Sequence, residues 1–384
     1  MFTRLTTLPP RSFFLFGPRG TGKTTWLRQQ LGHVPWFDLL DSEVYLDLLA
    51  DPSRLVRRLP VGHDGWVVID EVQRVPEVLN EVHRLVETRG VKFAMTGSSA
   101  RKLRQGGVNL LAGRAVTLRM HPLVCAEVGA GWQLRRALDI GGLPFAVTRP
   151  DSAEAKVFLH DYVQTYLREE VQAEGLTRNL AGFARFLEAA SFSQAAPLNV
   201  SAVARECGVE RKVVEDWFTV LEDLLLAFRL PVFSRRARRE LTVHAKFYFF
   251  DVGVFRALRP RGPLDSADEL DGAALETLLV QEIRAHNDAA GLGYALSHWR
   301  TRAGDEVDLV AYGERGLHAF EVKRSARVRA EDLAGLRVFR EEFPPARTWL
   351  LYGGERAYIE DGIQILPFAQ AIRDLPGMLA GGMA

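Results

Sequence analysis

The segment from Phe13 to Thr24 constrains the fold of this chain more than any other feature. A short apolar run, Phe13 to Phe16, leads into Gly17-Pro18-Arg19-Gly20-Thr21-Gly22-Lys23-Thr24, and a helical pattern begins at Lys23. A Gly-x-x-x-x-Gly-Lys-Thr motif between a strand and a helix is typical of a phosphate-binding loop. Glycines let backbone N–H groups approach an anion, and the helix N-terminus adds partial positive charge. The segment therefore predicts a phosphate site in an α/β fold.

The loop residues predict a nucleotide and a metal ion as cofactors. We expect Lys23 to place its ammonium on the β and γ phosphates of ATP and the Thr24 hydroxyl to bind Mg2+. The expected nucleotide-binding residues are contiguous: Gly17, Pro18, Arg19, Gly20, Thr21, Gly22, Lys23, Thr24 and Thr25.

A second apolar run ends in two carboxylates. Trp66 to Ile69 is followed by Asp70 and Glu71. Ligands of open α/β sheets bind at the carboxyl ends of the strands, so these side chains are expected beside the phosphates. Asp70 would bind magnesium, and Glu71 would polarise the attacking water as a general base.

Two further groups are candidates for contact with the γ phosphate. Ser98, in Thr96-Gly97-Ser98-Ser99, is the first choice among the hydroxyls after the next strand, and a helix N-cap is the alternative role. Phosphoryl transfer also benefits from an arginine, often from a neighbouring subunit. Arg114 is the candidate, Arg101 and Arg104 compete with it, and a solvated surface arginine is the alternative.

The pattern along the chain predicts several domains. Short strands and helices alternate up to about Leu118, which predicts a mostly parallel sheet. The breaks at Gly141 to Pro144 and at Arg259 to Pro263 suggest boundaries. We expect a P-loop ATPase domain (1–140), a helical linker or lid (141–178), a middle domain (179–260) and a C-terminal domain (261–384).

Several stretches together resemble a known group of proteins. They are the phosphate loop, Asp70-Glu71-Val72-Gln73-Arg74-Val75-Pro76, Thr96 to Ser99, Gly113-Arg114, Lys246 to Gly253 and Gly272 to Glu276. In these the chain resembles the prokaryotic AAA+-type ATPases that carry an uncharacterised C-terminal domain. The resemblance implies an AAA+ core and a homo-oligomer, as a ring or another assembly.

The middle domain has the pattern of a winged helix-turn-helix. A short helix capped by Ser201 and stopped at Gly208 precedes a longer helix, Arg211 to Leu226, and a hairpin with an arginine cluster. Such a module predicts DNA as partner, contacted through phosphates. The candidate residues are Arg211, Lys212, Arg235, Arg236, Arg238 and Arg239. The alternative is a packing module with a solvated basic loop.

The C-terminal domain carries acidic residues in the layout of a PD-(D/E)xK nuclease, without the proline of that name. Asp308 lies on one predicted strand. Glu321 and Lys323 lie on the next predicted strand, and because they are two residues apart their side chains point to the same face of the sheet. The carboxylates would hold Mg2+ while the lysine orients the water. Glu276 is the further metal candidate, and Glu282 a weaker one. A solvated strand face, or a degenerate fold that binds DNA without cutting, remains open.

Composition narrows the cellular setting. No apolar run reaches the roughly 18 residues of a membrane span, and no signal peptide is evident, so we expect a cytoplasmic protein without membrane contact. Cys125 and Cys207 are far apart, which predicts buried, inert thiols. The net charge of +1 neither supports nor excludes binding of nucleic acid.

Together these features predict an ATPase of α/β fold that acts on DNA: a P-loop AAA+-type parallel sheet, then a winged helix and a nuclease-like α/β domain. DNA processing, recombination or repair is the expected setting. The alternatives are a nucleotide-switched regulator whose C-terminal domain binds a partner, and a defence effector.

Overall fold

The computed structural model describes residues 2–99, 111, 113–166, 179–234, 244–260, 262 and 266–380. The chain divides into two compact units, one of residues 3–121 with 223–226 and one of residues 122–222 with 227 onward. No helix in these described ranges combines the length and the apolar character needed to cross a bilayer.

The first unit is built on a parallel five-stranded sheet, as the alternating pattern predicts. In chain order the strands are β1 (Phe13–Phe16), β2 (Trp36–Asp38), β3 (Trp66–Asp70), β4 (Lys92–Gly97) and β5 (Val116–Arg119). Their spatial order is β2-β3-β4-β1-β5, and all paired neighbours are parallel. β1 therefore lies between β4 and β5, which brings the phosphate loop close to the end of β4.

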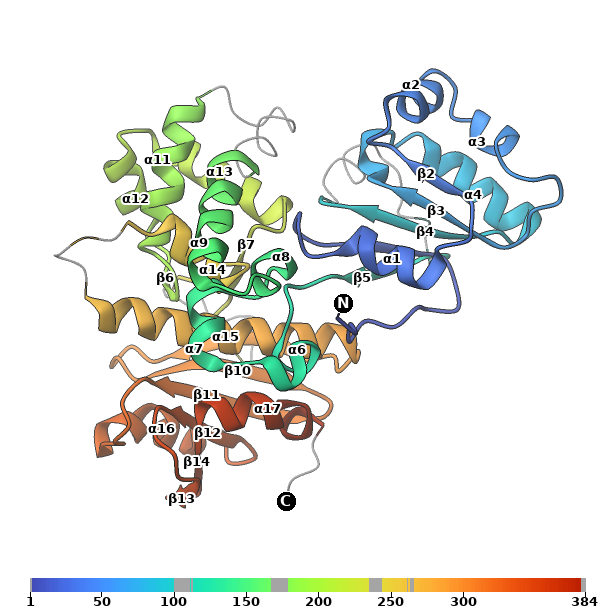
Figure 1. Ribbon diagram of the computed structural model, residues 1–384. Coiled ribbons are helices and arrows are strands. Elements are labelled where there is room, and N and C mark those ends of the chain that lie inside the picture. Colours follow the sequence, from blue (N-terminus) through green and yellow to red (C-terminus); the bar gives the residue numbers. More distant parts are fainter. Residues whose placement is uncertain are drawn as a thin grey trace. The chain divides into compact units, whose positions relative to one another are not determined.

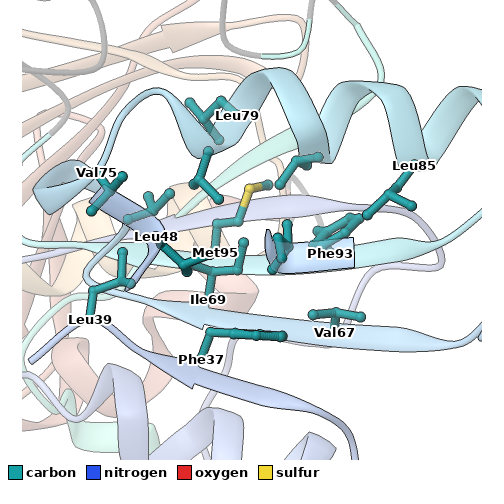
Figure 2. Close-up of a cluster of buried hydrophobic side chains, with 14 of the residues drawn as sticks. Phe37, Leu39, Leu48, Val67, Ile69, Val75, Leu79, Leu85, Phe93 and Met95 are labelled. Atoms are coloured by element: carbon teal, nitrogen blue, oxygen red, sulfur yellow. The ribbon is translucent and has the colours of Figure 1, made fainter. Parts of the chain in front are cut away.

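Helices cover both faces of this sheet because its strand residues alternate between two apolar clusters. Phe13 and Leu15 pack with Trp26 of α1 (Lys23–Leu31), whereas Phe14 and Phe16 belong to the opposite cluster. Figure 2 shows this opposite cluster, where Leu79 and Leu85 of α4 (Val78–Arg89) lie over β4. The described part of the unit also contains α2 (Ser42–Ala50), α3 (Arg54–Arg57) and a single 3-10 turn, η1 (Val72–Arg74).

The second unit begins with short helices that pack on a glycine pair. The helices are α6 (Cys125–Val128), α7 (Leu134–Ile140), α8 (Pro144–Val147) and α9 (Ser152–Asp161). A Cβ atom on Gly141 would lie 2.2 Å from Asp251 Oδ1, and Gly142 N donates to Asp251 Oδ2 at 2.7 Å. These glycines are therefore needed for close packing inside the unit, and the division into compact units falls before residue 122 rather than at residue 141.

Among the described residues from 179 onward, three helices and a small sheet come next. The helices are α11 (Leu180–Ser191), α12 (Val200–Cys207) and α13 (Arg211–Asp223); the sheet, in spatial order, is β6 (Ala196–Pro197), β8 (Lys246–Phe249) and β7 (Ala227–Leu230). Gly208 ends α12 in the left-handed conformation, as predicted. The predicted cap is wrong, however: Asn199, not Ser201, accepts the hydrogen bond from Ala202 N, because the helix begins at Val200.

The last part joins a long helix to a mixed six-stranded sheet (Figure 1). After α14 (Val252–Leu258), the helix α15 (Ala267–Ala289) begins directly after its cap, Ser266. The sheet, in spatial order, is β13 (Tyr358–Glu360), β14 (Ile363–Pro367), β12 (Arg347–Tyr352), β11 (Gly316–Lys323), β10 (Glu306–Gly313) and β9 (Ala295–Arg300). Helices α16 (Ala334–Glu342) and α17 (Phe368–Leu379) pack against it.

Candidate functional site

The phosphate loop connects β1 to α1, and its glycines are required by the backbone. Gly20 and Gly22 have φ angles of 82° and 92°, and Gly22 is the N-cap of α1. A Cβ atom on Gly17 would lie 2.4 Å from the carbonyl oxygen of Met120. Thr21 holds the loop by donating to Pro18 O at 2.8 Å. The loop is therefore a compact turn at the N-terminus of α1, where anions bind readily.

Lys23 lies along the inside of this loop. Its ammonium donates to Gly17 O at 2.6 Å and to Pro18 O at 3.2 Å, and the residue is only 6% exposed. Both contacts are with the loop that the lysine is expected to serve, so its charge is held beside the predicted phosphate site.

Thr24 and Asp70 are hydrogen-bonded across the sheet end. The Thr24 hydroxyl donates to Asp70 Oδ2 at 2.9 Å, and the Thr96 hydroxyl donates to Asp70 Oδ1. Burial raises the pKa of Asp70, while these two hydrogen bonds oppose the rise. A hydroxyl and a carboxylate at hydrogen-bond distance supply hard oxygen ligands, which fit a magnesium ion.

Glu71 follows β3 in an uncommon backbone conformation. Its φ and ψ angles are 60° and 45°, and its N–H donates to Thr96 Oγ1 at 3.0 Å. Gln73 donates from Nε2 to both Glu71 Oε2, at 2.5 Å, and Ser98 Oγ, at 3.2 Å. Glu71 and Ser98 are thus joined through Gln73, a residue to which the sequence assigned no role.

Arg114 lies at the surface of the first unit. Its guanidinium pairs with Glu87 of α4, and its side chain is 38% exposed. A role for Arg114 across a subunit interface stays a prediction. Its competitors Arg101 and Arg104 fall outside the described residues.

The acidic residues of the C-terminal domain do come together, on β10, β11 and α15. Asp308 Oδ2 accepts from Val322 N at 3.0 Å, and Asp308 N donates to Glu321 Oε2 at 3.3 Å. Lys323 Nζ donates to Glu321 Oε1 at 2.8 Å. Glu276 joins them from α15 through a residue that the sequence did not predict.

That residue is Lys246, at the start of β8. Its ammonium lies 2.8 Å from Glu276 Oε1, 3.0 Å from Asp308 Oδ1 and 2.8 Å from Glu306 Oε1. Tyr248, two residues on, donates to Glu276 Oε1. A sequence signal existed: a lysine that opens the buried aromatic run Phe247 to Phe250 needs an acidic partner.

Burial and charge decide the pKa values in this cluster. Burial opposes the charge of Lys246, which is 1% exposed, but Glu276 and Asp308 together raise its pKa well above the usual value. Burial also opposes ionisation of Asp308, but Lys246 holds the pKa of Asp308 below its usual value. Burial raises the pKa of Glu321 to about 8, and the nearby Asp308 contributes to the rise.

These carboxylates do not fit a metal ion in the observed arrangement. Within the described ranges, no three acidic, histidine or cysteine residues form a group that could hold one. Lys246 occupies Asp308 Oδ1 and the Val322 N–H occupies Oδ2. Glu282, the weaker candidate, lies apart from the cluster and accepts from Cys125 N at 2.7 Å.

The predicted DNA-binding residues are only partly described. Arg211 and Lys212 are exposed at the first turn of α13, where Arg211 pairs with Glu215 at 2.9 Å. Arg235, Arg236, Arg238 and Arg239 lie outside the described residues. Cys125 and Cys207 are buried free thiols, as expected, and burial raises the pKa of Cys125 to about 11.

Comparison with family models identifies three regions. Residues 10–129 match the model of an AAA domain. The N-terminal part of the chain carries an AAA+ ATPase-like domain. Residues 131–265 and 271–371 match two models described as Domain of unknown function (DUF8612) and Domain of unknown function (DUF4143).

Comparison with whole proteins gives distant likenesses. No curated protein matches the chain. The ORC1 protein of Aeropyrum pernix, solved in complex with DNA, is similar with 13% identity over 65% of this chain and 87% of that chain, at a TM-score of 0.29. A Vibrio cholerae protein is similar with 13% identity over 97% of this chain and 99% of that chain, at a TM-score of 0.25. TM-scores this low do not establish a shared fold.

Proposed function

We propose that the first unit hydrolyses ATP with Mg2+ at the end of β1, β3 and β4. One observation carries the proposal: hydrogen bonds run from Thr24 through Asp70 and Thr96 to the backbone of Glu71, and from the Glu71 side chain through Gln73 to Ser98. This arrangement connects the phosphate loop to the carboxylates at the end of β3. Phosphoryl transfer requires both parts, because one binds the phosphates and the other binds the metal and positions the water.

The proposed reaction gives a role to Lys23, Thr24, Asp70, Glu71 and Gln73. Lys23 exchanges its contacts with Gly17 O and Pro18 O for phosphate oxygens. Thr24 and Asp70 would hold magnesium, and the ion would offset the phosphate charge. Glu71 accepts the proton of the attacking water, and Gln73 keeps the carboxylate oriented.

We further propose that the whole chain acts on DNA as a homo-oligomer, with ATP driving assembly or translocation. Support comes from the exposed Arg211 and Lys212 and from the arginine cluster at 235–239, which together suit phosphate contacts. In this proposal residues 1–140 form the ATPase domain, 141–178 a helical linker, 179–260 a winged helix and 261–384 the nuclease-like domain. Arg114 would act across the subunit interface.

The deciding experiment measures ATP hydrolysis with and without duplex, single-stranded and four-way DNA. Strong stimulation by one of these DNAs supports the motor. Hydrolysis that is indifferent to every DNA contradicts it and favours the nucleotide-switched regulator.

A specific observation favours a second candidate for the C-terminal domain, namely binding without cutting. Lys246 already neutralises the carboxylates that a nuclease would use for its metal. DNA cleavage in Mg2+ that is weak in Ca2+ and lost in Asp308→Ala, with ATP hydrolysis intact, would establish the nuclease instead. Binding of DNA with no cleavage of any structure, with or without ATP, supports the second candidate.

A further inference from the structure

A cavity in the second unit lies apart from both sites described above. Its volume is about 220 Å³, and it is enclosed by α7 and the residues before it, by the Gly141–Gly142 pair and by the middle of α15. Gln133 and Gly131 at its rim are exposed, whereas Gln281 and Glu282 on α15 are buried. The cavity therefore runs from the surface to two buried polar side chains.

Gln281 has an amide group without a partner. The residue is 3% exposed, and among the described residues nothing bonds to its Nε2 or its Oε1. A Cβ atom on Gly142 would lie 3.0 Å from Nε2, so the glycine leaves room for the amide. A buried amide with both atoms unbonded is unfavourable, and such groups in native proteins normally meet a ligand or water.

Glu282 adds one more unsatisfied acceptor. Its Oε1 accepts from Cys125 N at 2.7 Å, but its Oε2 has no hydrogen-bond partner in the described part of the chain. The nearest ring nitrogen, His286 Nε2, is 3.9 Å away, beyond hydrogen-bond distance. The residue is fully buried, and burial raises its pKa to about 8.

The rest of the lining is mostly apolar and includes the aromatic side chains of Phe2 and Trp132, but it also contains Gln133 and Arg136. The Arg136 guanidinium donates to Ser152 Oγ and Arg149 O. Trp132 is 7% exposed and lines the cavity together with Ala137, Ile140 and Leu278. An indole and aliphatic side chains suit the faces of a planar ring, while the polar groups suit its edge. The lining thus combines apolar side chains with the unbonded polar atoms of Gln281 and Glu282.

We propose that this cavity binds a small planar heterocycle that carries an exocyclic amino group beside a ring nitrogen, as adenine and cytosine do. A primary amide presents one acceptor and one donor side by side, which pair with such an amino group and ring nitrogen. Glu282 Oε2 accepts the second hydrogen of the amino group when its carboxyl is ionised, which requires a pH above about 8 in the folded protein. The ligand is either a free base or a base attached to a sugar.

The test is calorimetric titration of the full chain above about pH 8, with the P-loop saturated by a non-hydrolysable inosine triphosphate analogue, whose oxo base the cavity is expected to reject. The probes are adenine, cytosine and adenosine, with hypoxanthine and uracil as matched compounds in which an oxo group replaces the amino group. We expect one equivalent of adenine or cytosine to bind, at least about tenfold more tightly than its oxo counterpart. Adenosine distinguishes a free base from a base on a sugar.

Two variants connect this binding to the cavity. Gln281→Leu removes the donor and the acceptor, and Glu282→Gln keeps an oxygen for Cys125 N but turns the free acceptor into a donor. Each is expected to weaken binding at least about tenfold, whereas Glu355→Gln, an exposed control, leaves it unchanged. If Gln281→Leu does not fold, Glu282→Gln carries the test.

Three outcomes overturn the proposal. They are equal affinity for amino and oxo compounds, affinity unchanged in a folded Gln281→Leu or Glu282→Gln variant, and no binding of any probe. The last means that the cavity holds water only.

Discussion

Glu71 combines an unfavourable backbone with a position next to the phosphate loop. A non-glycine residue at φ 60° is uncommon and persists only where its surroundings hold it. Here Thr96 accepts the Glu71 N–H and Gln73 donates to the carboxylate. The strained backbone therefore directs the Glu71 side chain toward Gln73 and Ser98 instead of along the strand.

This geometry gives the first prediction. Glu71→Gln keeps the size and the backbone of Glu71 but not the base, so ATP stays bound while hydrolysis falls by roughly two to four powers of ten. Lys23→Ala removes the phosphate contact, so nucleotide binding or hydrolysis is lost. Nucleotide-binding and turnover assays on both variants separate the two roles, and unimpaired turnover in Glu71→Gln would remove Glu71 from the mechanism.

The second prediction concerns Glu282 and pH. Burial raises its pKa to about 8 from an ordinary value of 4.5, so the unfolded chain releases the proton at a lower pH than the folded chain. The carboxyl therefore favours folding less and less as pH rises from 4.5 to about 8, and the effect is constant above that range. Urea unfolding of wild type and Glu282→Gln across this range should show the variant gaining in relative stability. A difference that does not change with pH contradicts the assignment.

Individual site residues were predictable from the sequence where they belong to a short local motif. Lys23, Thr24, Asp70 and Glu71 follow directly from short motifs, because their positions depend on a strand end and the turn after it. Lys246 does not, because its partner Asp308 is 62 residues away and the contact exists only after two sheets pack together.

Among the elements, α12 offers a clean comparison. Asn199 caps the helix by accepting from Ala202 N at 3.0 Å, whereas Ser201 is an exposed residue within the first turn. The third prediction is that Asn199→Ala lowers the free energy of unfolding by about 0.5–2 kcal/mol. Ser201→Ala is the matched control and should change it little; equal losses in both variants by chemical denaturation would disprove the assigned cap.

The fourth prediction concerns the strand β8. Lys246→Met leaves Glu276 and Asp308 buried without their cation, which should lower the free energy of unfolding by about 3–5 kcal/mol. Lys323→Met is the control, because Lys323 is 35% exposed and contacts only the edge of the cluster. Denaturant unfolding should show a clearly smaller loss for the control; similar losses would mean that Lys246 does not neutralise the cluster.

The strands of the first sheet were predictable from the sequence. The five strands of the first sheet are short apolar runs between helical patterns, and their order of appearance suffices to predict a parallel sheet. The glycine pair at 141–142 was not predictable in the same way. The sequence does not distinguish a glycine that permits close packing from a glycine in a linker. Only the neighbour in the folded chain, here Asp251, shows that close packing requires the glycine.

For the whole molecule, the fifth prediction concerns DNA. Replacing Arg235, Arg236, Arg238 and Arg239 by alanine should weaken binding similarly for all sequences, because phosphate contacts carry no base information. The salt dependence should flatten by roughly one unit of slope per lost contact. Fluorescence anisotropy at several salt concentrations measures both; if affinity and slope stay unchanged, the cluster is a solvated loop.

The ion pairs of Lys246 with Glu276 and Asp308 also limit which parts of this chain can be exchanged separately. Lys246 lies in the region that matches one family model, 131–265, while Glu276 and Asp308 lie in the region that matches another, 271–371. A gene fusion at residues 266–270 could replace one region and keep the other. Replacing the first region would leave the Glu276 and Asp308 carboxylates buried without an ammonium group, and replacing the second would leave the Lys246 ammonium buried without carboxylates. Replacing one region alone is therefore expected to destabilise the second unit unless both sides of the charge pairing change together.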